Sequence, residues 1–104
     1  MKEANIIFVS EHLANARLHA GIYASSRQNV PPTKVMARWD LMTNRIEHDK
    51  LADATHLVLL DRKLGAGLKQ LIGRKYPKVK LLPIAELAQH PEGWSAALAE
   101  IISQ

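Results

Sequence analysis

Four polar residues near the N-terminus could together bind an anion. They are Ser10, His12, Asn15 and Arg17. They follow an apolar run at residues 6–9 and stand at the start of a helical pattern, where the first N–H groups are unpaired and the helix end is positive. The turn has no glycine and matches neither glycine-rich phosphate-binding signature, and Glu11 would repel an anion. An anion site in this turn is therefore one of two hypotheses for the chain.

The same turn offers two nucleophiles, but the sequence defines no partner group for either. Ser10 would need a general base to attack a substrate, and in front of a helix it is more simply a capping oxygen. His12 and His19 could share one helix face and titrate near neutrality, although two surface histidines explain the same spacing. With no cysteine in the chain, a thiolate nucleophile is excluded. We therefore expect no catalytic residues and favour a protein without enzymatic activity.

Three further polar residues stand beside predicted strands, namely Asp40, His56 and Asp61. The two aspartates could face one crevice and bind a cation or act in acid–base chemistry. Aspartates at strand ends also form ordinary turns and caps, which is the interpretation we favour. The five histidines show neither H-x-x-x-H nor H-E-x-x-H spacing, so neither a metal nor another cofactor is expected.

Positive charge is concentrated in residues 62–80. This segment holds seven of the 14 Lys and Arg residues and none of the ten Asp and Glu residues, in a chain of net charge +4. The seven are Arg62, Lys63, Lys69, Arg74, Lys75, Lys78 and Lys80. Such asymmetry indicates a surface for an acidic protein or a nucleic acid, while a merely solubilising surface is the simpler alternative. Only Tyr76 interleaves the charges, and no nucleic-acid-binding motif is present.

Alternating apolar runs and helix-period stripes predict the elements that position these residues. The predicted strands are 6–9, 34–39, 57–60 and 79–82. The predicted helices are 11–26, 46–54, 64–75 and a last one from Pro91 to the C-terminus. In the second strand we expect Val35, Ala37 and Trp39 on one side.

This order predicts an α/β fold, a three-layer sandwich with a four-stranded, mainly parallel sheet and helices on both faces. Ligands of such sheets gather at the carboxyl ends of the strands, which here means residues 10–15, 40–45 and 61–67. The expected core comprises Ile7, Val9, Leu13, Ala20, Val58, Leu60, Leu68, Leu71, Leu81, Trp94, Leu98 and Ile101.

The chain has 104 residues, 47% of them hydrophobic and 23% charged, which is typical of one globular domain over residues 1–104. Its apolar runs are far shorter than the roughly 20 residues of a membrane span. The N-terminus lacks the features of a secretory signal, so a cytoplasmic location is expected.

Two stretches carry a family resemblance. A strand ending in Phe8-Val9 turns at once into an alanine-rich helix, and residues 51–61 read Leu-Ala-Asp-Ala-Thr-His-Leu-Val-Leu-Leu-Asp. Together they resemble the low-molecular-weight protein tyrosine phosphatases, whose first loop has the pattern C-x5-R-S. Ser10 stands where that family has its cysteine, and Ala16 stands where it has its arginine. The resemblance implies a related fold without thiolate chemistry.

Two functional hypotheses follow. The leading one is a non-catalytic binding or regulatory module that contacts an acidic partner through residues 62–80. The alternative is a phosphatase-like or phosphocarrier-related domain that binds a phosphate group at the first strand–helix loop. The chain also resembles, more faintly, the small B-components of sugar phosphotransferase systems, which carry a phosphoryl group in a loop after a strand. In a phosphocarrier-related domain of this kind, His12 would stand in the corresponding loop.

Overall fold

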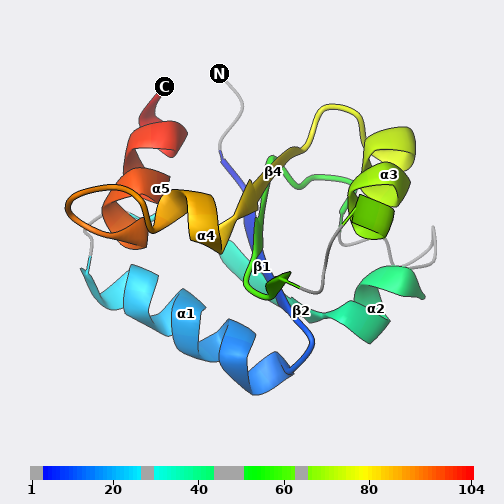
Figure 1. The fold of residues 1–104 in the computed structure, drawn as a ribbon, viewed down its shortest axis with the longest axis horizontal. Coiled ribbons are helices and arrows are strands. Elements are labelled where there is room, and N and C mark those ends of the chain that lie inside the picture. The colour runs from blue at the N-terminus through cyan, green and yellow to red at the C-terminus, as the bar shows by residue number, and fades with distance from the viewer. Residues whose placement is uncertain (1–3, 27–29, 44–50, 63–65) are drawn as a thin grey trace.

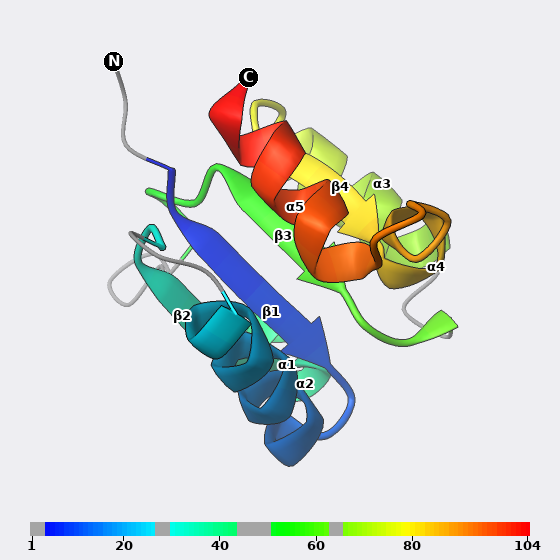
Figure 2. The same ribbon diagram turned by 90° about the vertical axis from the view of Figure 1, so that its left-hand side faces the viewer.

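The centre of the fold is a sheet of four parallel strands. The computed structural model describes residues 4–26, 30–43, 51–62 and 66–104. The strands are β1 (Ile6–Ser10), β2 (Thr33–Ala37), β3 (His56–Leu59) and β4 (Lys80–Pro83). They lie in the order β2-β1-β3-β4, and each neighbouring pair is parallel (Figure 2). The predicted parallel sheet is therefore confirmed.

Helices cover both faces of the sheet (Figure 1). They are α1 (Leu13–Ser26), α2 (Arg38–Met42), α3 (Ala66–Lys75), α4 (Ile84–Leu87) and α5 (Trp94–Ser103). Helices α1, α4 and α5 lie on one face, and α2 and α3 lie on the other. The predicted three-layer α/β sandwich is thus confirmed, with α4 as a short helix that the sequence pattern did not reveal.

Strand alternation divides the core into two layers. Ile7 and Val9 point into the layer beneath α2 and α3, where they pack with Met36 and Ile72. Ile6 and Phe8 point the other way, into the layer beneath α1 and α5. Because every residue of β1 is buried, this strand reads as a continuous apolar run.

The aromatic residues of the second layer are clustered. Phe8 lies 6.2 Å from Tyr23 and 6.0 Å from Trp94 between ring centroids, the latter edge to face. These geometries are the favourable ones for aromatic pairs. The cluster joins β1, α1 and α5 at the centre of this face.

The second strand differs from the prediction. It ends at Ala37, and Trp39 belongs to α2, where 73% of its surface is exposed. Met36, expected on the opposite side from the apolar residues, is buried under α2 with Leu41. Val35 and Met36 face opposite core layers, as predicted. The prediction that Trp39 shares a side of the strand with Val35 and Ala37 was wrong, because Trp39 lies in α2.

Leu71 and the last helix differ from the sequence-based expectation. Leu71 is 46% exposed, and the neighbouring Ile72 is buried. Helix α5 begins at Trp94 rather than at Pro91, since Gly93 adopts a positive φ of 98° just before it. Val9, Val58, Leu60 and Leu98 are buried as predicted, whereas the side chain of Leu68 lies outside the described residues.

The predicted helix at 46–54 falls mainly outside the described residues, and 51–53 form a turn. Across the described ranges, no helix is both long and apolar enough to cross a lipid bilayer.

Candidate functional site

The carboxyl ends of β1 and β3 bring Ser10 and Asp61 together. The chain leaves β1 toward β2 on one side and later enters β3 on the other, so the strand order reverses between these two neighbours. Ser10 is the fully buried last residue of β1, and its hydroxyl donates to Asp61 Oδ2 at 2.8 Å. The same carboxylate oxygen accepts the Glu11 N–H at 2.6 Å. The reversal point is therefore held by a hydrogen-bonded Asp61 carboxylate.

The Ser10 hydroxyl uses its full hydrogen-bonding capacity. Besides donating to Asp61, it accepts the His12 N–H and the Asn15 side-chain amide, each at 3.2 Å. A serine hydroxyl has one proton and two lone pairs, and here the proton is donated to the Asp61 carboxylate while both lone pairs accept N–H groups. The hydroxyl thus organises the turn that precedes α1, since the His12 N–H that it accepts comes before the first residue of the helix, Leu13.

Asp61 occupies the position where a bound anion would be expected. A phosphate at the start of α1 would need the Glu11 N–H, which already donates to the carboxylate. It would also approach the negative charges of Asp61 and Glu11. In the described arrangement the chain itself supplies the anion for this turn.

The four predicted anion-site residues do not all converge. Ser10 and Asn15 are hydrogen-bonded to each other, whereas the His12 side chain is exposed. Arg17 is also exposed and lines a shallow hollow on α1 together with Leu18 and Ile22. The residue that completes the turn is Asp61, which the sequence placed at a strand end and paired with Asp40 rather than with Ser10.

Asp40 acts at the start of α2. Its carboxylate accepts the Ala37 N–H at 3.4 Å, which supports the interpretation as a cap. Nearby, Arg38 forms an ion pair with Glu11 at 3.7 Å. Within the described part of the chain, no group of three or more His, Asp or Glu residues could hold a metal ion.

A second candidate site lies along α3 and the chain that follows it. We define the basic flank as the six described cations Arg62, Lys69, Arg74, Lys75, Lys78 and Lys80; Lys63 lies outside the described residues. All six are exposed, and none forms an ion pair with a carboxylate of the described residues. Helix α3 packs beside β4 at one edge of the sheet (Figure 1), so the chain that carries Lys69 to Lys80 lies at that edge.

His56 is the buried titratable residue of β3, with 9% of its surface exposed. Its Nδ1 lies 2.7 Å from the hydroxyl of Thr55, and the tautomer decides which group donates. Burial, with a smaller contribution from the charge of Lys80, which pairs with it across β3 and β4, lowers the pKa of His56 below its ordinary value of 6.5. The native fold therefore favours a neutral imidazole.

We expect the free energy of unfolding to fall as the pH drops below 6.5, because the unfolded chain then binds a proton at His56 that the native state disfavours. The contribution of neutral His56 to the free energy of unfolding is complete above pH 6.5 and is lost as the pH falls through the lowered pKa. Because His56 binds a single proton, its effect on the free energy of unfolding cannot exceed about 1.4 kcal/mol per pH unit. Urea unfolding from pH 8 to about pH 5 measures it.

The control for this prediction is a pair of variants. His56→Gln should remove the contribution of His56 to the slope, whereas His12→Gln, at an exposed side chain, should leave that contribution in place. An unchanged slope in His56→Gln would contradict the assignment.

Comparisons with known proteins found no match to this chain among protein-family models, curated proteins or solved structures.

Proposed function

We propose that this protein is a non-catalytic binding module, acting in the cytoplasm, that contacts an acidic partner through the basic flank. The observation that carries the proposal is that six exposed cations in one stretch of the chain form no ion pair with a carboxylate of the described residues. Charges arranged in this way attract a partner of opposite sign and speed its association. The fully bonded Ser10 supports the non-catalytic part of the proposal.

The shape of the flank favours an extended partner. Helix α3 has ten residues and is therefore about 15 Å long. Arg62 precedes it on the carboxyl side of the sheet, whereas Lys78 and Lys80 follow it on the amino side. A small ligand could meet only one part of this row, but an extended acidic segment could meet most of it.

An acidic protein segment fits the flank better than a nucleic acid does. Single strands are held partly by stacking on exposed aromatic rings. Tyr76, the only aromatic residue among these charges, is half-buried, and the Lys75 ammonium lies 5.4 Å from the centre of its ring. The flank therefore offers charge without a free stacking surface.

Charge reversal in the middle of the flank tests the proposal. We expect the Lys69→Glu, Arg74→Glu double variant to bind a fluorescent polyglutamate peptide at least about tenfold more weakly than wild type. Wild-type binding should weaken steeply between about 0.05 M and about 0.5 M salt, because the attraction is screened. Fluorescence anisotropy measures both effects.

The matched control is the Arg17→Glu, Lys34→Glu double variant, which makes the same change of charge at two exposed residues outside the flank. It should retain most of the affinity. Equal losses in the two double variants, or binding indifferent to salt, would contradict the proposal. Tighter binding of duplex or single-stranded DNA than of polyglutamate would assign the flank to nucleic acid instead.

The alternative function, phosphate binding at the first loop, has less support. The Asp61 carboxylate already accepts the Glu11 N–H, and Arg17 contributes to a different surface. The relationship to tyrosine phosphatases and a phosphocarrier role for His12 remain predictions from the sequence.

A further inference from the structure

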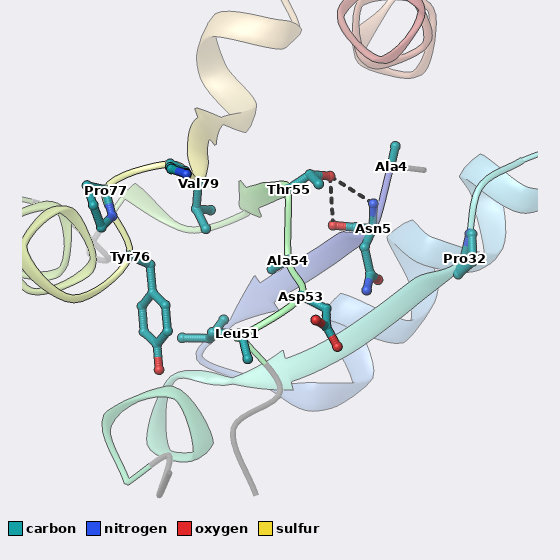
Figure 3. A pocket seen from close by; sticks show the side chains of 12 residues that line it. Ala4, Asn5, Pro32, Leu51, Asp53, Ala54, Thr55, Tyr76, Pro77 and Val79 are labelled. Atoms are coloured by element: carbon teal, nitrogen blue, oxygen red, sulfur yellow. Dashed lines mark hydrogen bonds between the residues drawn. The ribbon is translucent and has the colours of Figure 1, made fainter. Parts of the chain in front are cut away.

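A cavity of about 650 Å³ opens at the amino edge of the sheet, opposite the edge that holds Ser10 and Asp61. It is lined by the residues that lead into the four strands (Figure 3). Pro32 precedes β2, Asn5 precedes β1, residues 51–55 precede β3, and residues 76–79 precede β4. Its volume falls within the range of about 300–1,000 Å³ that is usual for small-ligand sites.

The cavity wall is largely apolar. Leu51 and Ala54 are buried, and Tyr76, Pro77 and Val79 line the side toward α3 (Figure 3). Removing apolar ligand surface from water against such a wall is favourable. The main body of a ligand here should therefore be apolar.

Three polar groups of the cavity have no hydrogen-bond or ion-pair partner among the described residues. Asn5 Oδ1 is buried without a hydrogen-bond donor, which is an unfavourable state for an amide oxygen. Asp53 and Lys78 are exposed, and neither forms an ion pair with a described residue. A ligand that brought a donor to Asn5 and opposite charges to the other two would satisfy all three groups.

The main chain around Asn5 holds this group in place. The Asn5 N–H donates to Thr55 Oγ1 at 2.8 Å, and the Asn5 carbonyl accepts the Thr55 N–H at 2.9 Å. These bonds tie the start of β1 to the start of β3 (Figure 3). The backbone of Asn5 is therefore fixed at the cavity wall, while its buried amide oxygen has no hydrogen-bond donor.

The strand order places Asn5 and Lys78 at opposite ends of the cavity. The lead-in of β3, with Asp53, lies between that of β1, with Asn5, and that of β4, with Lys78. In Figure 3 Asn5 stands on one side, and Pro77 and Val79, the neighbours of Lys78, stand on the other. Two strand spacings are about 10 Å, which two or three residues of extended peptide span.

We propose that this cavity binds a short apolar peptide with free termini, two or three residues long. The peptide ammonium donates to Asn5 Oδ1 and faces the Asp53 carboxylate, and the peptide carboxylate faces Lys78. Its apolar side chains lie against Leu51, Ala54 and Tyr76. This inference is independent of the basic flank, although Lys78 belongs to both surfaces.

A titration of 15N-labelled protein with leucyl-alanyl-leucine, followed by NMR, tests the proposal. We expect saturable shifts of the amides of Ala54, Thr55 and Val79. Acetylation of the peptide N-terminus should weaken binding about tenfold, because the charged donor is lost. Amidation of the C-terminus should weaken it about threefold, since the Lys78 pair is exposed to solvent.

Two charge-removing variants assign each peptide end. Asp53→Asn should weaken binding of the unmodified peptide about threefold but leave binding of the acetylated peptide unaffected. Lys78→Gln should likewise weaken binding of the unmodified peptide about threefold but leave binding of the amidated peptide unaffected. Glu92→Gln and Lys34→Gln, at exposed residues outside both the cavity and the basic flank, are the matched controls and should leave peptide binding unchanged. Absence of shifts at millimolar peptide, shifts confined to another surface, or equal affinity for all three peptides would overturn the proposal.

Discussion

Replacing Leu98 by Ala is expected to lower the free energy of unfolding by about 2–5 kcal/mol. Leu98 lies in α5, has none of its surface exposed, and belongs to the core layer that contains Phe8 and Val58. The truncation would remove buried methyl groups and leave a cavity that the surrounding strands and helices could close only in part. Urea unfolding monitored by circular dichroism measures the loss.

Leu71 provides the matched control for this prediction. It is also a helical leucine that the sequence pattern assigned to the core, but 46% of its surface is exposed. Leu71→Ala should therefore cost less than about 1 kcal/mol, because its side chain gains less from burial. A loss in Leu71→Ala as large as that in Leu98→Ala would contradict the packing of α3 and α5.

The second large effect is expected at Asp61. Asp61→Ala should lower the free energy of unfolding by about 1.5–3 kcal/mol, the usual range for a hydrogen-bonded charged group. The substitution leaves the Ser10 hydroxyl and the Glu11 N–H without their acceptor at the start of α1. Asp53→Ala, which removes an exposed carboxylate that forms no ion pair with a described residue, is the control and should cost little.

The same substitution also tests whether Asp61 blocks an anion site. With the carboxylate removed, the Glu11 N–H is free, and inorganic phosphate should raise the melting temperature of Asp61→Ala. Wild type should show no comparable shift at the same ionic strength. Equal stabilisation of both proteins by phosphate would contradict the blocking role, and equal indifference would show that the turn binds no anion even without Asp61.

Local pattern was sufficient to predict the fold class of this chain. The apolar runs at residues 6–9 and 57–60 become β1 and β3, the two central strands, and every residue of β1 and β3 is buried. A strand covered on both faces needs apolar residues at consecutive positions, so its own residues reveal it without any knowledge of its neighbours. Helix stripes between such runs then imply parallel pairing.

Individual side-chain environments depended on distant elements. Met36 is buried because α2 lies over it, and Ile72 rather than Leu71 faces the sheet because of the way α3 is seated. At an edge strand or on a short helix, adjacent apolar residues compete for the same buried position. The alternation along the chain indicates that one of them is buried, and packing against the neighbouring elements selects which.

The Ser10–Asp61 turn and the cavity beside Asn5 also depend on contacts between separated segments. Ser10 meets Asp61 across 51 positions of sequence because β1 and β3 are neighbours in the sheet. The rule that ligands gather at the carboxyl ends of strands directed attention to Ser10 and away from the cavity beside Asn5. Residue types and spacing restrict which groups are available, but strand order brings them together, since hydrogen bonds and cavities form only between segments that the fold makes adjacent.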